Sequence, residues 1–136
     1  MKILAVDYGK KRTGLAETDD LKMIASPLTT VPTKDIWLFL EKYLAENQVD
    51  TLVVGEPFTE EGDWNPVEKD IRVFLNKFRK KYPGIKIERE DERYTSKMAF
   101  QSMIDGGLPK KKRRRKEVVD KVSAALILQS YLNGKQ

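Results

Sequence analysis

The fold is decided first by residues 2–17, KILAVDYGKKRTGLAE. Residues 2–7 form a short apolar run that ends in Asp7, which is typical of a buried strand. Residues 8–11 are expected to turn the chain, and residues 12–17 return as a second strand with Gly14 inside it. We therefore predict two adjacent strands at the start of the chain, with a carboxylate at the end of the first.

Farther along, strand patterns alternate with helix patterns. The expected strands are residues 23–31, 51–54 and 85–90, with an irregularity or an edge at Pro27, and the expected helices begin near Thr33, Asn65, Thr95 and Glu117. Thr33 can cap the first of these helices and Asn65 the second. Helix crossovers join parallel strands, so the two later strands should pair in parallel. The sequence thus predicts an α/β fold with a mixed five-stranded sheet, a three-strand antiparallel meander plus two parallel strands, flanked by helices. We see no linker or repeat, and we expect a single domain over residues 1–136.

Composition limits the available chemistry. The chain has no His and no Cys, which excludes serine, cysteine and zinc chemistry built on those residues. Carboxylates that hold a hard divalent cation then become the natural candidates. The absence of Cys fits a reducing compartment. No apolar window approaches the length of a membrane span, and the start of the chain does not resemble a signal peptide, so we expect a cytoplasmic protein.

Several acidic residues stand where a lone carboxylate is costly. Asp7 and the pair Asp91-Glu92 each follow a strand pattern, and Asp120 interrupts the apolar pattern of the last helix. Burying an ionised carboxylate costs on the order of several kcal/mol unless a counter-charge or a metal accompanies it. The ends of parallel strands meet at one edge of a sheet, so these acids can converge. Converging carboxylates repel one another unless a divalent cation neutralises them, which predicts a metal site suited to phosphodiester hydrolysis.

Each acid also has an ordinary structural explanation. Asp7 could begin a turn. The pair at 91–92 could form a surface ion pair with Arg89 or Arg93. Asp120 could be a first-turn helix acid. Any one of them is a weak signal, whereas the set, in a chain whose element order can bring them into contact, favours a site.

Positive charge is concentrated in residues 110–116, KKKRRRK. The formal net charge is +5, and without these seven cations it would be −2. Runs of like charge are usually solvated, and residues 106–116 are expected to form a flexible basic loop. The run immediately precedes the helix that carries Asp120, so phosphates bound by it would lie beside the acids. Without interleaved aromatic residues it indicates contacts to a nucleic-acid backbone rather than to bases.

Five motifs follow one another between residues 3 and 132. They are residues 7–16 DYGKKRTGLA, 26–28 SPL, 54–57 VGEP, 91–96 DERYTS and 119–132 VDKVSAALILQSYL. Together they resemble the YqgF/RuvX family of Holliday-junction-resolvase-like proteins, within the RNase H-like superfamily. The resemblance implies an RNase H-like fold and a metal-dependent nuclease with Asp7, Glu92 and Asp120 as its acidic positions. It also implies ribosome biogenesis, because the family is linked to maturation of the 5′ end of pre-16S rRNA, although it was first proposed as junction resolvases.

We therefore predict a two-metal phosphodiester hydrolase. Asp7, Glu92 and Asp120 are expected to be both the catalytic residues and the ligands of Mg²⁺ or Mn²⁺. Asp91 and Glu56 are held in reserve as ligands. Alternation along a strand lets only one of Asp91 and Glu92 face the metal. Glu56 stands between Gly55 and Pro57, where the family often has an apolar residue.

Predicted contacts to nucleic acid are the basic residues near these acids. They are Lys11, Arg12, Arg93, Lys110, Lys111, Lys112, Arg113, Arg114, Arg115 and Lys116. The expected partners are pre-rRNA or branched DNA, with ribosomal precursor particles as a further candidate and no membrane. Both a monomer and a homodimer stay open.

Three rival functions also stay open. A Holliday-junction resolvase would cut branched DNA, and a non-catalytic module of the same fold would only bind nucleic acid. The Asp-x-Gly turn also occurs in ATP-binding modules of the actin and sugar-kinase type. Those need two such lobes, whereas 136 residues supply one.

Overall fold

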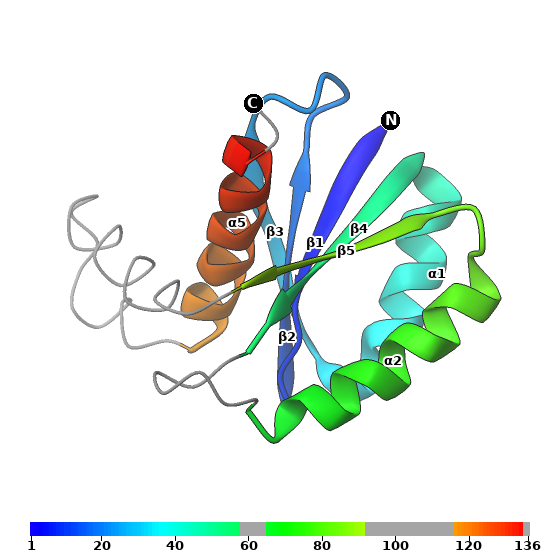
Figure 1. Ribbon diagram of the computed structural model, residues 1–136, viewed down its shortest axis with the longest axis vertical. Helices are drawn as coiled ribbons and strands as arrows, with labels where there is room; N and C mark the ends of the chain where they lie inside the picture. The colour runs from blue at the N-terminus through cyan, green and yellow to red at the C-terminus, as the bar shows by residue number, and fades with distance from the viewer. Residues whose placement is uncertain (58–64, 92–115, 135–136) are drawn as a thin grey trace.

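The structure is a computed structural model that describes residues 1–57, 65–91 and 116–134, with the backbone alone for residues 116–120. The strands in these ranges are β1 (Lys2–Asp7), β2 (Arg12–Thr18), β3 (Ala25–Pro32), β4 (Val49–Glu56) and β5 (Lys86–Asp91). The helices are the 3-10 turn η1 (Thr33–Asp35), α1 (Ile36–Glu46), α2 (Val67–Lys81) and α5 (Lys116–Gly134) (Figure 1). The helix expected from Thr95 and most of the basic run lie outside the described residues.

The strands form one mixed sheet in the order β3-β2-β1-β4-β5 (Figure 1). β2 pairs antiparallel with both β1 and β3, whereas β4 pairs parallel with both β1 and β5. This sheet confirms the predicted antiparallel meander plus two parallel strands. β3 lies at an edge, and its pairing with β2 shifts between Leu15 and Ala16, close to Pro27, where an irregularity or an edge is expected.

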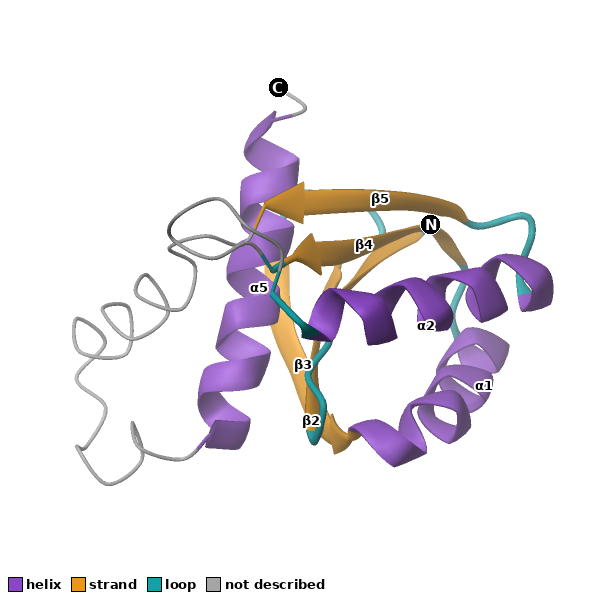
Figure 2. Cartoon of the chain, turned by 60° about the horizontal axis from the view of Figure 1, so that its bottom comes forward, coloured by secondary structure: helices purple, strands orange, loops and turns teal. Residues whose placement is uncertain are grey.

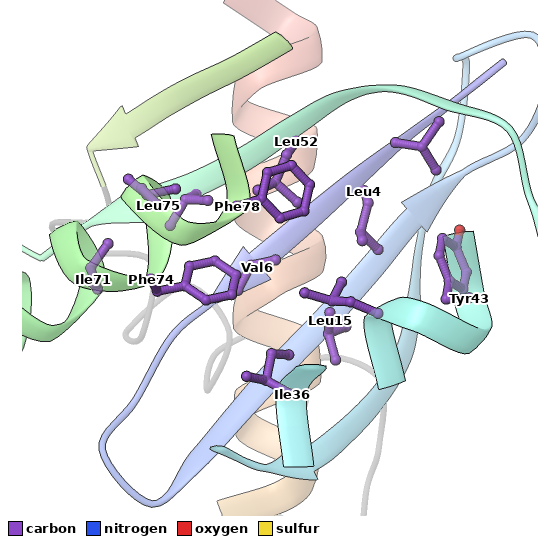
Figure 3. Packing of buried hydrophobic residues seen from close by; sticks show 13 residues of the cluster. Leu4, Val6, Leu15, Ile36, Tyr43, Leu52, Ile71, Phe74, Leu75 and Phe78 are labelled. Carbon is purple, nitrogen blue, oxygen red and sulfur yellow. The ribbon is translucent and has the colours of Figure 1, made fainter. Parts of the chain in front are cut away.

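Helices cover both faces of the sheet (Figure 2). α1 and α2 lie on one face and α5 lies on the other. The side chains of β1 alternate between these layers, as a pleated strand requires. Leu4 and Val6 pack with residues of α1 and α2 (Figure 3), whereas Ile3 and Ala5 pack with residues of α5. The buried stripe of α2 follows the expected helical spacing and consists of Ile71, Phe74, Leu75 and Phe78.

The turn between β1 and β2 requires a glycine. A Cβ on Gly9 would lie 2.5 Å from the carbonyl oxygen of Arg12, which no larger residue tolerates without a shift. The hydroxyl of Thr33 donates to the Gly9 carbonyl oxygen at 2.6 Å, and its backbone N–H donates to the Lys11 carbonyl oxygen at 2.9 Å. The prediction that Thr33 caps the helix is wrong, because this hydroxyl is used to tie the turn to the start of η1.

The start of α2 agrees with its predicted cap. The Val67 N–H donates to Asn65 Oδ1 at 3.1 Å, and the Glu68 N–H donates to the Asn65 carbonyl oxygen at 2.9 Å.

Among the helices described, none is long and apolar enough to cross a membrane.

Candidate active site at the sheet edge

Three carboxylates lie at the ends of neighbouring parallel strands. Asp7 ends β1, Glu56 ends β4 and Asp91 ends β5. The register pairs Val6 with Val54 and Glu56 with Asp91, so all three strands finish at the same edge of the sheet. The convergence of strand ends that the sequence predicts is therefore present for the described residues.

The pleat divides these acids between the two faces of the sheet. Asp7 continues the series of Ile3 and Ala5, which pack against α5, so Asp7 belongs to the α5 face. In β4, Leu52 and Val54 pack on the opposite face, and Glu56 continues their series toward α1 and α2. Alternation thus separates Glu56 from Asp7.

β5 shows the same division through its polar contacts. Arg89 reaches Glu68 of α2, with Nη2 to Oε1 at 2.7 Å, whereas Glu90 accepts a hydrogen bond from Ser130 Oγ of α5 at 2.9 Å. Asp91, two residues after Arg89, therefore belongs to the α2 face. A strand continued by one residue would return to the α5 face, but Glu92 itself lies outside the described residues.

Position 120 lies in helix α5, which packs against the sheet. It precedes Ala124 by four residues and Ile127 by seven, and both are fully buried in the cluster with Ile3, Ala5 and Val53. Helix α5, which carries Asp120, thus lies on the face of the sheet to which Asp7 belongs. The Asp120 side chain lies outside the described part of the chain.

The candidate metal site is only partly described. Within residues whose side chains are described, no group of three or more acidic, His or Cys residues is close enough to hold a metal ion. Two of the three predicted ligands, Glu92 and Asp120, stand outside that set. Glu56 and Asp91, the reserve ligands, are at the same edge but on the other face.

Two of the predicted nucleic-acid contacts lie in the segment that turns the chain from β1 into β2, a few residues after Asp7. Lys11 is exposed at the turn between β1 and β2, and Arg12 begins β2 with part of its surface accessible. Arg93 and the cations at 110–115 lie outside the described residues, and Lys116 begins α5 without a described side chain. The described turn alone thus brings two cations close to the end of β1.

A buried ion pair that is not predicted from the sequence joins the same edge to helix α2. Arg89 joins the ends of β4 and β5 to Glu68, which is only 3% exposed. Arg72 Nε adds a further hydrogen bond to Glu68 Oε2 at 3.0 Å. Burial alone would raise the pKa of Glu68, but the hydrogen bonds from Arg89 and Arg72 outweigh it and hold the pKa below its ordinary value.

A sequence signal for this pair exists. Glu68 precedes Ile71 by three residues and Leu75 by seven, so it occupies the apolar stripe of α2 rather than its polar side. An acid on such a stripe calls for a buried cation. Arg89 was expected, at most, to form a surface pair with an acid at 91–92, and its described partner Glu68 lies in another element.

The sequence of this chain is similar to those of known proteins. A family model described as RuvX, Holliday junction resolvase, matches residues 1–134. A protein of Christiangramia forsetii is 56% identical over 131 residues, which cover 96% of this chain and 97% of the relative. A protein of Phocaeicola vulgatus is 49% identical over 135 residues, covering 99% and 97%. Both are named, provisionally, pre-16S rRNA nucleases.

Solved structures share the fold at low sequence identity. T. thermophilus RuvC in complex with a Holliday junction substrate matches with a TM-score of 0.60 and 18% identity, covering 99% of this chain and 95% of that one. This likeness confirms the predicted RNase H-like fold. The family description and the names of the relatives confirm the prediction of a nuclease, which is a phosphodiester hydrolase. The chain belongs to the RuvX family.

Proposed function

We propose that this chain is a metal-dependent endonuclease, acting as one domain in the cytoplasm, that processes the 5′ end of pre-16S rRNA. Asp7, Glu92 and Asp120 are the proposed catalytic residues and metal ligands. The proposal rests on the packing of α5: Ile3 and Ala5, whose series Asp7 continues, pack against this helix, and the same helix carries position 120. Acids on one face can meet at one ion, whereas acids on opposite faces of a sheet cannot.

The same division supports Glu92, rather than Asp91, as the third ligand. Asp91 belongs to the face of Arg89 and Glu68, and the next position in an alternating strand belongs to the face of Glu90 and α5. Glu56 is excluded from the proposed ligand set by the same reasoning. Both reserve acids then border the site from the far side of the sheet.

Mg²⁺ or Mn²⁺ fits the donors that this edge offers. The chain has no His or Cys, so the donors are carboxylate oxygens, which hard divalent cations prefer. When bound, such ions would activate water and stabilise the leaving oxygen of a phosphodiester. The three carboxylates hold and orient them, and proton transfer falls to a carboxylate or to solvent because no histidine is present.

Basic residues orient the substrate in this proposal. Lys11 and Arg12 lie one turn away from Asp7 and can contact phosphates next to the scissile bond. Arg93 and the cations at 110–116 are proposed to contact the backbone farther along. Binding through such contacts weakens as the salt concentration rises. Ribosomal precursor particles are the proposed setting, since the relatives are named for pre-16S rRNA.

Cleavage of branched DNA is the second candidate. The family description names a Holliday junction resolvase, and the RuvC structure holds a junction substrate. We favour RNA because the relatives with 49% and 56% identity carry the rRNA name.

A substrate panel tests the proposal. Labelled pre-16S rRNA 5′ regions, unrelated structured RNA and four-way DNA junctions are incubated with Mg²⁺, Mn²⁺ or EDTA. We expect cleavage of the precursor RNA that EDTA and Asp7→Asn both abolish. Faster cutting of the junction than of any RNA would make branched DNA the substrate in place of pre-16S rRNA. Cleavage that survives Asp7→Asn would rule out the proposed site.

A further inference from the structure

The guanidinium of Arg89 donates four hydrogen bonds to groups of the described residues. Nη2 donates to Glu68 Oε1 at 2.7 Å and Nη1 donates to Glu68 Oε2 at 3.1 Å, which is a bidentate pair. Nη2 also donates to the Gly55 carbonyl oxygen at 2.9 Å, and Nε donates to the Val54 carbonyl oxygen at 3.2 Å. One side chain of β5 therefore holds the last residues of β4 and the first turn of α2 together.

These contacts lie directly beside the acidic edge. Val54 is paired with Val6, the residue before Asp7, and it is also paired with Arg89. Gly55, whose carbonyl accepts from Arg89, is therefore the β4 residue level with Asp7. Arg89 stands two residues before the end of β5. Any change in the Arg89 contacts must therefore alter the backbone on which the ends of β4 and β5 are built.

A contribution to stability does not by itself explain why this fold has a buried ion pair between Arg89 and Glu68. A buried ion pair must offset the desolvation of two charges, and well-packed apolar side chains often serve a fold as well or better. What a bidentate arginine adds is direction, because its planar fork fixes the angle between the groups that it joins. The Glu68 carboxylate is 4% exposed and receives hydrogen bonds from two arginines, so the arrangement is held firmly.

We infer that Arg89 and Glu68 are positioning residues for the reaction, because they lock the ends of β4 and β5 in register beside Asp7. The inference rests on the proposed function, since the register of these strand ends decides how far Asp7 lies from ligands on its neighbours. Neither residue touches metal or substrate in this account. They act through the backbone of Val54 and Gly55.

Two comparisons separate positioning from folding. Arg72→Gln removes the partly exposed contact to the same Glu68 and leaves the Arg89 contacts in place. Glu17→Gln disturbs a second polar network, in which Glu17 Oε1 is bonded to Lys2 and Tyr43 at the opposite end of the sheet. Neither control should change the geometry beside Asp7.

The experiment measures Mn²⁺ binding, kcat and KM for Arg89→Met and for both controls, together with amide exchange at Gly55 and Glu56. Groups that orient metal ligands typically contribute about 10–100-fold to metal affinity or activity. For Arg89→Met we expect Mn²⁺ affinity and kcat to fall by about 10-fold or more, with KM within about 3-fold, and exchange at Gly55 to accelerate. Both controls should stay within about 3-fold of the wild type in every readout.

A paired variant keeps the test decisive if Arg89→Met does not fold. Arg89→Met with Glu68→Leu removes both charges, which buried pairs often tolerate, yet it still lacks the contacts to Val54 and Gly55. A folded paired variant with wild-type Mn²⁺ affinity, kcat and exchange would overturn the inference. If the wild type cleaves no substrate, the proposed function fails on its own. The Mn²⁺ and exchange measurements then still decide whether Arg89 positions the strand ends.

Discussion

The two ends of the sheet hold their hydrogen-bonded carboxylates in different ways. At the end where β1 begins, Glu17 Oε1 accepts from Tyr43 Oη at 2.6 Å and from Lys2 Nζ at 3.2 Å, and its side chain is 25% exposed. At the end where β1 finishes, Glu68 is 4% exposed and is bound bidentately by Arg89. The side chains of lysine and tyrosine can adjust their positions, whereas a bidentate arginine fixes the positions of the groups that it joins.

This difference shows which end of the sheet requires a defined geometry. A partly exposed network suffices where strands only need to pair. The rigid pair stands where, in our proposal, acids from separate strands must meet at a metal. Sheets in α/β proteins commonly carry function at the carboxyl ends of parallel strands, and the proposed metal site follows that rule.

The largest expected effect contrasts the two faces at the acidic edge. Asp7→Asn should lower kcat by about 10³-fold, since it removes a ligand that holds charge in the transition state. Glu56→Gln makes the same change of charge on the opposite face and should change kcat by less than about 5-fold. Single-turnover cleavage of the labelled precursor RNA measures both, and gel-shift binding should show RNA retained by Asp7→Asn. Equal losses in the two variants would contradict the division between faces.

The next effect contrasts the carboxylates of Glu68, which is buried, and Glu17, which is partly exposed. Arg89→Met leaves Glu68 buried without its main partner, and breaking a buried pair in this way costs about 3–5 kcal/mol of unfolding free energy. Glu17→Gln keeps the hydroxyl of Tyr43 bonded to a neutral acceptor and should cost about 1 kcal/mol. Urea unfolding at neutral pH measures both. Similar costs would mean that the two networks are equivalent.

A smaller effect concerns the turn that carries Lys11 at the acidic end. Gly9→Ala would place a Cβ 2.5 Å from the Arg12 carbonyl oxygen. Forcing such overlap typically costs about 1–3 kcal/mol, here with a shift of the β1–β2 turn. Gly84→Ala is the matched control, because a Cβ there meets no atom within 4 Å. Thermal unfolding of the two variants compares them, and equal melting temperatures would refute the close approach.

The smallest effect is a difference in pH dependence. The pKa of Glu68 is lowered in the folded state, so its contribution to stability is present at neutral pH and is lost as the pH falls below about 4.3. Burial and the hydrogen bond to Glu17 raise the pKa of Tyr43, so its contribution begins to be lost as the pH rises above about 10.

Unfolding free energies measured across pH test this contrast. Glu68→Gln should flatten the acidic slope and leave the alkaline slope unchanged, and Tyr43→Phe should do the reverse. If Glu68→Gln leaves the acidic slope as steep as in the wild type, other carboxylates dominate acid unfolding.

The features that the sequence predicts are local ones. The apolar runs of β1 and β4, the stripe of α2 and the cap at Asn65 depend on residues a few positions apart, and all appear as expected. The parallel pairing of β4 with β5 also follows, because helix α2 joins them.

The features that differ from the predictions, or that were not predicted, depend on partners far away in the chain. Thr33 could cap a helix by its local pattern, but its hydroxyl donates a hydrogen bond to the Gly9 carbonyl oxygen instead. Glu68 fits a helix start locally, yet its partner is Arg89, 21 residues away. The division of acids between faces needed the observed packing of Ile3 and Val6, since a pattern of alternation does not tell which helix covers which face.

Direct titration of Mn²⁺ tests the central claim, that the metal lies on the α5 face of the sheet edge. Electron paramagnetic resonance counts free Mn²⁺ in titrations of the wild type, Asp7→Asn and Glu56→Gln, without any need for substrate. We predict that Asp7→Asn weakens Mn²⁺ binding by at least about 10-fold and that Glu56→Gln leaves it unchanged. Weakened binding in Glu56→Gln together with wild-type binding in Asp7→Asn would contradict the account.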